Sequence, residues 1–173
     1  MIAIKRELNL ITLTAFIFDI HEGAQKMLDL IEEISINDPI TLEDLAMVTW
    51  EPGVKNPKTK QTNGPISNGA LSGAFWGLLF SRIFFIPSFG MAVGAAMGSL
   101  DGKFAAYGIS NRFSNSVGEQ VSEGTSALFL MGTDVQVEKI DQAAKQEGLV
   151  YESISAKLSD EQEKQLRQDF GAE

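Results

Sequence analysis

Hydrophobic and polar positions along the first third of the chain predict a β-α-β unit followed by a polar strand. The stretch TLTAFIFDI at residues 12–20 is rich in β-branched and aromatic side chains, as is typical of a buried strand. Residues 21–34 follow the helical period, with these apolar side chains on one face: Ala24, Met27, Leu28, Ile31 and Ile34. Beyond an Asn-Asp-Pro turn, residues 42–51 predict a second strand and residues 54–62 a lysine-rich third one.

The last third of the chain repeats the β-α-β pattern. Residues 124–133 form a second strongly apolar strand, and residues 134–148 have the spacing of an amphipathic helix. Thr133 and Gln136 have the spacing of a capping box at the start of that helix. Residues 149–155 then predict the returning strand.

Two further helices are predicted from their first residues. Ser110 can cap a short amphipathic helix, and Ser159 with Gln162 has the capping-box spacing at the start of a C-terminal helix. In that last helix Glu163 and Arg167 are four residues apart, the spacing of a surface ion pair.

Together the two β-α-β units predict an α+β fold, most economically a ferredoxin-like sandwich with right-handed crossovers on one sheet. This α+β domain comprises residues 11–62 and 109–173, and residues 63–108 form an insertion between its halves.

The insertion is apolar and rich in glycine. Between Lys60 and Asp101 only Arg82 is charged. Glycines recur every fourth residue on both sides of Pro87, namely at Gly69, Gly73 and Gly77 and at Gly90, Gly94, Gly98 and Gly102. In a helix this spacing produces a bare stripe that lets a second backbone approach closely. The pattern predicts a glycine-zipper helical hairpin that turns near Pro87.

The lengths of the two arms limit how the hairpin can meet a membrane. Residues 69–86 would extend about 27 Å and residues 88–100 about 20 Å at the helical rise per residue. A full crossing takes about 20 apolar residues, so the first arm is marginal and the second is too short. Arg82 near the turn would cost about 2.5–3.5 kcal/mol at the bilayer midplane, which favours a position at the far interface or inside an oligomer.

Three interpretations of the hairpin remain open. It dips into or barely crosses a bilayer, it packs against hairpins of other copies, or it folds back as a core helix pair of a soluble monomer. Large apolar side chains surround the arms, which speaks against the monomer because a small domain has little surface to cover them. They are Phe75, Trp76, Leu79, Phe80, Phe84, Phe85 and Phe89.

Composition narrows the possible partners. The net charge is -9, and the excess of acids speaks against nucleic acid and against loose electrostatic binding to anionic lipid. The chain has no cysteine, which excludes disulfides and thiolate metal sites. Lysines flank the hairpin, at Lys55, Lys58, Lys60 and Lys103. They indicate a cytoplasmic location for both hairpin ends, or simply an edge strand protected from aggregation.

No catalytic constellation is recognisable. His21 is the only histidine, so a multi-histidine metal site is excluded and an acid–base pair has no evident partner. The GSLDGKF segment at residues 98–104 lacks the spacing and the hydroxyl of a phosphate-binding loop. We therefore expect no cofactor, no metal and no enzymatic activity. Asp101 is expected to make a structural pair, with Lys103 as a candidate partner.

Several segments are similar to one family. SGAFWGLLF, FGMAVGAAMGSLDGK, the following YGIS and the strand GTSALFLM resemble the domain of unknown function 1269 family of predicted bacterial membrane proteins. The likeness extends from IFDIHEGAQKML to LSDEQEKQLRQDF. This resemblance implies a ferredoxin-like body with a glycine-rich hairpin and a membrane location, and it supplies no reaction and no catalytic residue.

The sequence as a whole predicts a non-enzymatic, membrane-associated and self-associating protein. In this hypothesis the hairpin anchors and oligomerises a cytoplasmic α+β domain, and its partners are the lipid bilayer, other copies and an unidentified protein. The alternative is a soluble, oligomeric ligand-sensing or regulatory module with the hairpin buried between subunits.

Overall fold

A computed structural model describes residues 10–62, 66–85 and 97–171, and in these residues five strands and six helices form an α+β fold. The strands are β1 (Ile11–Phe18), β2 (Asp44–Thr49), β3 (Lys58–Gln61), β4 (Ser126–Thr133) and β5 (Glu152–Lys157). The helices are α2 (Gly23–Ile34), α3 (Gly73–Phe84), α4 (Met97–Ala106), α5 (Asn111–Gln120), α6 (Asp134–Gln146) and α7 (Asp160–Phe170). The predicted α+β class is confirmed, and each strand and helix expected outside the insertion is present with ends shifted by a few residues.

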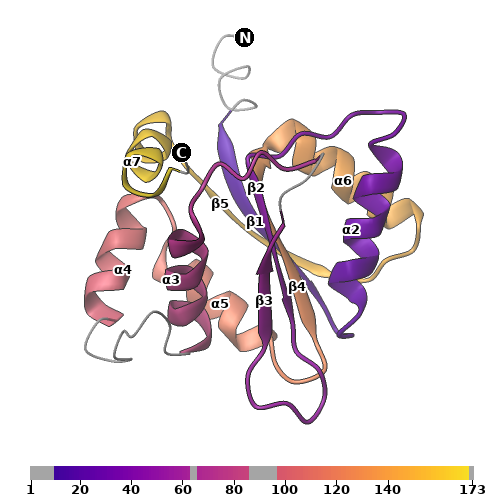
Figure 1. The fold of residues 1–173 in the computed structure, drawn as a ribbon, viewed down its shortest axis with the longest axis horizontal. Coiled ribbons are helices and arrows are strands. Elements are labelled where there is room, and N and C mark those ends of the chain that lie inside the picture. Colours follow the sequence, from indigo (N-terminus) through magenta and orange to yellow (C-terminus); the bar gives the residue numbers. More distant parts are fainter. Residues whose placement is uncertain (1–9, 63–65, 86–96, 172–173) are drawn as a thin grey trace.

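The strands form one antiparallel sheet in the order β3-β2-β4-β1-β5. Strands β1 and β4 pair along their whole length, with Ala15 opposite Phe129. Because β4 lies between β1 and β2, and β1 between β4 and β5, each β-α-β unit crosses over one strand of the other. The two units therefore interlock in a single sheet (Figure 1).

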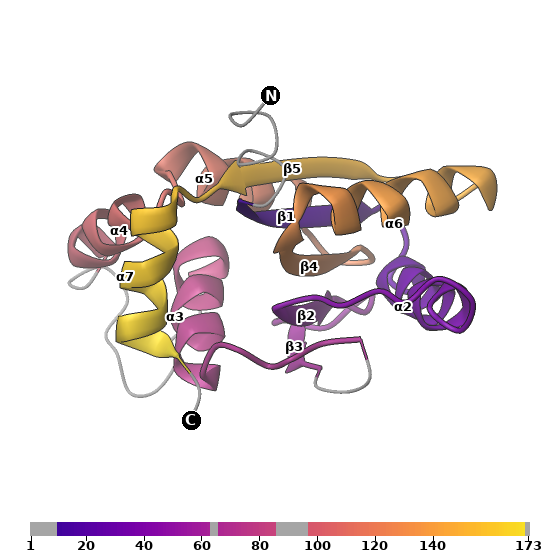
Figure 2. The ribbon, with the colours of Figure 1, turned by 90° about the horizontal axis from the view of Figure 1, so that it is seen from above.

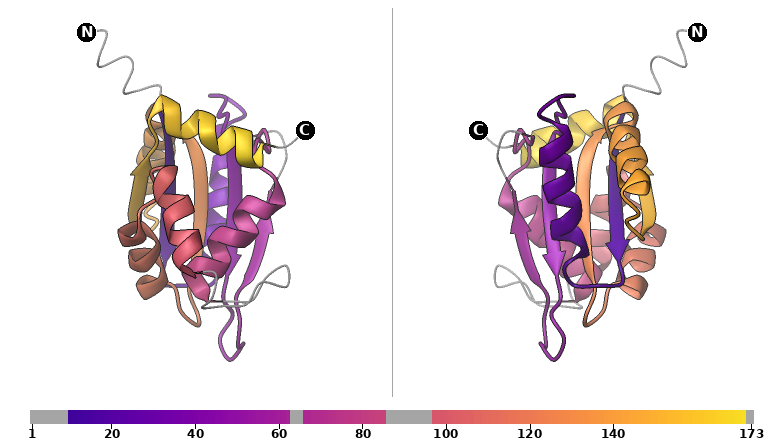
Figure 3. Two further views of the ribbon diagram at one scale, coloured as in Figure 1. Left: turned by 90° about the vertical axis from the view of Figure 1, so that its left-hand side faces the viewer. Right: turned by 90° about the vertical axis from the view of Figure 1, so that its right-hand side faces the viewer.

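Helices cover both faces of this sheet (Figure 2). One face packs against α2 and α6, through a core that includes Phe16, Ile31, Leu128 and Ile140. The amphipathic pattern of these two helices accounts for their position, since their charged side chains lie on the outside. The right panel of Figure 3 shows this layer facing the viewer, and the left panel shows the opposite layer facing the viewer.

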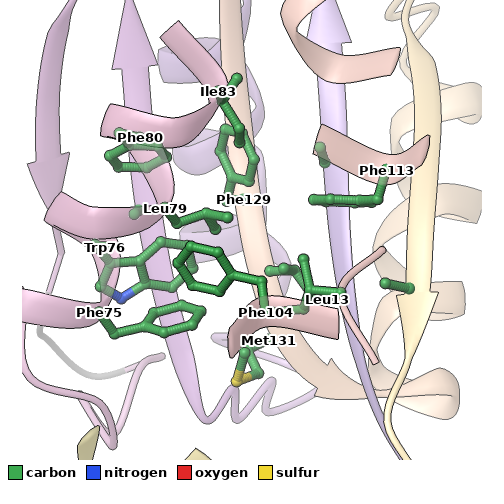
Figure 4. Close-up of a cluster of buried hydrophobic side chains, with 14 of the residues drawn as sticks. Leu13, Phe75, Trp76, Leu79, Phe80, Ile83, Phe104, Phe113, Phe129 and Met131 are labelled. Atoms are coloured by element: carbon green, nitrogen blue, oxygen red, sulfur yellow. The ribbon is translucent and has the colours of Figure 1, made fainter. Parts of the chain in front are cut away.

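The other face is covered by α3, α4, α5 and α7, so part of the insertion belongs to the core of the monomer (Figure 1). Phe129 lies at the centre of this face and has an alanine opposite it on each neighbouring strand, Ala15 and Ala46. The small neighbours leave room for two aromatic rings of α3. Trp76 and Phe80 lie with their ring centroids 6.3 and 5.1 Å from that of Phe129 (Figure 4).

This packing corrects one expectation from the sequence. Phe75, Trp76, Leu79 and Phe80 were expected on the outside of a hairpin, facing lipid or other copies, but each is at most 5% exposed within one copy. The sheet has a second apolar face that a two-layer sandwich would leave open, and these side chains cover it. Phe85 is 59% exposed, and Phe89 lies outside the described residues.

A buried carboxylate fixes the start of α3 to the sheet. Asp44 of β2 is fully buried, and its oxygens accept hydrogen bonds from the Gln61 amide at 3.0 and 3.1 Å and from the Leu71 N–H at 3.0 Å. The same Gln61 amide donates to the Leu71 carbonyl at 2.8 Å. Ser72, the residue before α3, donates its N–H to the Phe170 carbonyl of α7. The chain therefore enters α3 along a path set by β2, β3 and α7.

The expected helix starts are partly confirmed. The Ser110 side chain accepts a hydrogen bond from the Phe113 N–H, and Ser159 with Gln162 forms both bonds of a capping box. At Thr133 the side chain accepts from the Gln136 N–H at 3.4 Å, but Gln136 Oε1 is buried without a partner, so the second half of that box is not formed. Glu163 and Arg167 make the expected ion pair at 2.8 Å.

Candidate functional site

The glycines predicted to form a zipper differ in how far the structure describes them. Gly73 and Gly77 lie in α3, Gly98 and Gly102 lie in α4, and Gly69 precedes α3 with a φ of +60°. The other three predicted residues, Gly90, Gly94 and Pro87, lie outside the described residues. The role of the stripe as a contact between helices stays a prediction.

Two of these glycines face open space. A Cβ atom at Gly73 would have the Gln61 side chain as its nearest neighbour at 3.8 Å, and one at Gly102 would meet nothing within 4 Å. Gly118 of α5, which the spacing rule did not select, behaves differently. A Cβ atom there would lie 2.9 Å from the Ile83 carbonyl oxygen of α3. Close approach between helices within the monomer therefore depends on Gly118.

Arg82 joins three helices. It lies in the last turn of α3 and is only 6% exposed, and its Nε forms a short ion pair with Asp101 of α4. Its Nη2 donates to the Asn115 side-chain oxygen of α5 at 2.8 Å. Asp101 thus makes its structural pair with Arg82 instead of Lys103, and the Arg82 side chain is 7% exposed within one copy.

A cavity of about 300 Å³ opens beside Arg82. Aromatic side chains from two layers form one wall, with Trp50 and Phe84 in an edge-to-face contact at 6.3 Å and Phe85 5.8 Å from the guanidinium carbon. The polar lining consists of Arg82, Ser114, Asn115 and Glu119. Trp50 is held by a hydrogen bond from its Nε1 to the Val54 carbonyl at 2.8 Å.

Two helices end at this cavity. Phe84 is the last residue of α3, and Glu119 lies in the last turn of α5. The last carbonyl groups of a helix lack intrahelical partners and carry the negative end of its dipole. The guanidinium charge of Arg82 is matched by Asp101, so Glu119 and the two helix ends leave the cavity with an excess of negative charge.

The sequence analysis identified Arg82 but not the rest of this cavity. Trp50 comes from the end of β2, Phe84 from α3 and Glu119 from α5, and no spacing rule relates residues so far apart. One local signal exists in the sequence, because an acidic side chain in the last turn of a helix opposes the helix dipole. Glu119 is such a residue.

Each helical layer also contains an aspartate that accepts a hydrogen bond from a tyrosine, which is buried at Tyr107 and half-buried at Tyr151. The Tyr107 hydroxyl donates to Asp169, and the Tyr151 hydroxyl donates to Asp141 with a short hydrogen bond. In both cases burial and the hydrogen bond raise the tyrosine pKa. Burial alone would raise the pKa of the Asp141 carboxyl, but hydrogen bonds from Tyr151 and Lys145 outweigh it and lower that pKa. The first pair joins the end of α4 to α7 and the second joins the start of β5 to α6, and neither borders the Arg82 cavity.

Within residues 10–62, 66–85 and 97–171, no group of three or more His, Cys, Asp and Glu side chains is placed to hold a metal ion. His21 lies 3.0 Å from Glu22, measured from Nδ1 to Oε1. Of the helices in this part of the chain, none combines the length and the apolar character that a membrane crossing requires.

Comparison with known proteins gives one match. A family model described as "Protein of unknown function (DUF1269)" matches residues 70–171, which include α3 and every later element. Neither the curated proteins nor the solved structures contain a match to the chain. The matched region begins just before α3, so the apolar helices and the second β-α-β unit fall within one family unit.

Proposed function

The chain belongs to the DUF1269 family, whose members are described as proteins of unknown function, and we propose that it is a non-enzymatic protein that associates with itself and with a lipid bilayer. In this proposal α3, α4 and the sequence between them provide the contact, and the sheet with α2 and α6 is displayed on the cytoplasmic side. A ferredoxin-like topology of the body, apart from the added strand β3, is part of the proposal. It is supported by the order β2-β4-β1-β5 and the two interlocked β-α-β units.

The outer side of α3 carries this proposal. A surface helix of a soluble protein normally presents charged and polar side chains to water. In α3 the two polar side chains, Ser81 and Arg82, are buried, and the positions left exposed or half-buried carry no charge: Gly73, Ala74, Gly77, Leu78 and Phe84. Such a face suits close packing against another helix, in lipid or in a second copy.

The sequence that follows α3 supports a contact with lipid. From Ile83 to Leu100 it includes no charged residue, and Phe85 at its start is 59% exposed. Attachment through such a segment requires no helix that crosses the bilayer. The exposed Lys58 and Lys60 of β3 and Lys103 of α4 are consistent with a cytoplasmic location of the body.

Flotation with vesicles tests the lipid contact. We expect the protein to float with phosphatidylglycerol vesicles and Phe85→Asp to float several-fold less, because a charge then enters the apolar contact. Ile36→Asp is the matched control, since Ile36 is 80% exposed and follows α2 in the opposite layer. Equal flotation of the two variants would contradict the proposed position of the contact.

The mass of the particle in solution tests self-association. Gly73→Leu with Gly102→Leu should lower the oligomer mass, because a Cβ atom at either position meets no atom closer than 3.8 Å among the described residues, whereas the larger side chain prevents close approach of a second copy. Gln25→Leu with Gln142→Leu adds the same side chains on the outer faces of α2 and α6 as a control. A monomeric wild-type protein, both in buffer and in detergent, would refute this part of the proposal.

The cavity beside Arg82 favours a second candidate, a soluble oligomeric module that senses a ligand, with α3 and α4 buried between subunits. Cell fractionation separates the two functions. A protein released entirely into the soluble fraction by a carbonate wash would favour the sensor, and one retained with membranes would favour the anchor.

A further inference from the structure

We propose that the cavity between the ends of α3 and α5 binds the ammonium group of a small alkylamine. The inference goes beyond membrane association and applies to the protein free in solution. It rests on three features of the cavity that each favour a positively charged ligand, and on the volume of the cavity. A volume of about 300 Å³ is sufficient for a short alkylammonium ion.

The first feature is the aromatic wall. Trp50, Phe84 and Phe85 line the cavity, and the faces of such rings attract cations. The protein already uses this interaction at the same place, where the Arg82 guanidinium carbon lies 5.8 Å from the Phe85 ring centroid. Trp50 is kept in position by its bond to the Val54 carbonyl and by its edge-to-face contact with Phe84.

The second feature is the convergence of two helix ends. Each helix contributes about half a negative charge at its C-terminus. Helices α3 and α5 approach closely there, since a Cβ atom at Gly118 would lie only 2.9 Å from the Ile83 carbonyl oxygen. At the end of α5 the Val117 carbonyl already accepts from the Val121 N–H, so the two helix ends act on the cavity mainly through their dipoles. Ser114 adds a hydroxyl oxygen to the same lining.

The third feature is Glu119. This exposed residue lines the cavity from the last turn of α5, where an acid opposes the helix dipole and so weakens the helix. A cation in the cavity would remove that conflict. Arg82 does not reverse the preference, because its Nε is paired with Asp101 and its Nη2 with Asn115, so an incoming anion would meet Glu119 and a guanidinium already neutralised.

The two tryptophans provide a direct test by NMR in lipid-free buffer. Trp50 lines the cavity, whereas Trp76 lies in the core at 2% exposure and serves as an internal reference. We expect n-butylammonium to shift the Trp50 indole N–H signal saturably, with a dissociation constant on the order of 1 mM. The Trp76 signal should not move. Butanol and butyrate, which match the probe in length, should leave both signals unchanged.

A charge-removing variant and its control sharpen the test. Glu119→Gln should weaken n-butylammonium binding about fivefold, as expected for losing one partly solvated charge near the ligand. Glu147→Gln removes the same charge from the exposed C-terminal end of α6, outside this cavity, and should not change the affinity. An unchanged affinity in Glu119→Gln, an equal shift with butanol, or saturable binding of butyrate would each overturn the proposal.

An ammonium group can reach the cavity on a free amine or on a lipid headgroup, and vesicles distinguish these sources. If the headgroup is the ligand, wild-type protein should bind vesicles containing phosphatidylethanolamine more tightly than vesicles of phosphatidylglycerol alone, and n-butylammonium should compete. If the ligand is a free amine, the two vesicles should bind alike while the Trp50 shift in buffer persists. Failure of flotation with both vesicles would refute the membrane proposal and leave the amine site intact.

Discussion

The two helical layers both cover an apolar face of the sheet, but their outer surfaces differ in charge. On one face α2 buries Met27 and Ile31 and exposes Lys26, Asp29, Glu32 and Glu33. On the other face α3 buries Trp76 and Phe80 just as completely, yet its outer side presents only uncharged side chains. Burial in the core therefore explains the inner half of α3, and Leu78 and Phe84 also pack in part against this core, but it does not account for the absence of charge at the remaining outer positions.

This difference separates two properties of α3 that occur together in its sequence, its many large apolar residues and its lack of charge on the outer side. The density of large apolar residues in α3 reflects the second apolar face of the sheet, where Phe129 lies between two alanines. The absence of charge on the outer side of α3 is a separate feature, and the proposed contact with lipid or with a second copy rests on it. Membrane or oligomer contact should accordingly depend on Gly73, Gly77 and Phe85, and stability should depend on Trp76.

The largest expected change in the free energy of unfolding comes from a substitution on the buried side of α3. Trp76→Ala should reduce the free energy of unfolding in lipid-free buffer by about 3–5 kcal/mol, the range found for large aromatic side chains in cores. Phe85→Ala, at a position that is 59% exposed, should change it by less than about 0.5 kcal/mol. Urea unfolding followed by circular dichroism measures both. A small loss for Trp76→Ala would mean that α3 does not belong to the cooperative core.

The next effect concerns the attachment of α3 to the sheet. Asp44→Ala removes the side-chain acceptor of the Leu71 N–H and leaves the Gln61 amide with only the Leu71 carbonyl, and it should cost about 2–3 kcal/mol. Asp44→Asn keeps one acceptor oxygen and should cost less. The α2 layer has no equivalent contact through a fully buried carboxylate among the described residues. If both variants unfold like the wild type in urea, α3 is held by its apolar contacts alone.

The two layers also differ in how far the sequence predicted them. Helices α2 and α6 were predicted because their own residues alternate between polar and apolar at the helical period. The position of α3 depends on residues far from it in the sequence, because it packs on the second apolar face of the sheet. A signal for it exists, since Leu13, Ala15 and Ile17 alternate with Thr14, Phe16 and Phe18, so both faces of β1 are suited to burial.

The cavity was less predictable than the fold. Its walls come from the end of β2, the end of α3 and the end of α5, and their meeting depends on the packing angle of α3 on the sheet. Gly118 allows that approach, but its sequence neighbours gave no reason to select it over the seven glycines at four-residue spacing. Periodicity identifies faces of single helices, whereas contacts between helices depend on the three-dimensional arrangement.

Two glycine substitutions are expected to change the stability in opposite directions, because one glycine lies in a helix contact within the monomer and the other faces open space. Gly118→Ala places a Cβ atom 2.9 Å from the Ile83 carbonyl and should destabilise the protein by about 1 kcal/mol after the gain in helix propensity. Gly102→Ala meets nothing within 4 Å and should stabilise the monomer by about 0.5–1 kcal/mol. Thermal unfolding at a dilution that keeps the protein monomeric measures both. A destabilising Gly102→Ala would place that glycine in a contact within the monomer.

The smallest expected effect compares the tyrosine–aspartate pairs of the two layers as a function of pH. The lowered pKa of Asp141 means that its charged form is stabilised in the folded protein. That stabilisation is present above the unfolded pKa of about 3.9 and is lost as the pH falls through the lower folded value. Tyr151→Phe removes one of the hydrogen bonds responsible and should cost about 0.5–1 kcal/mol at pH 7.

As Asp141 becomes protonated, the cost of Tyr151→Phe should decline, so the melting temperatures of variant and wild type should converge below about pH 4. Tyr107→Phe provides the comparison in the other layer, where the Tyr107 hydroxyl donates to Asp169 between α4 and α7. A melting difference for Tyr151→Phe that stays constant from neutral to acid pH would show that its hydroxyl stabilises the protein through the Asp141 carbonyl, 3.0 Å away, and not through the carboxylate.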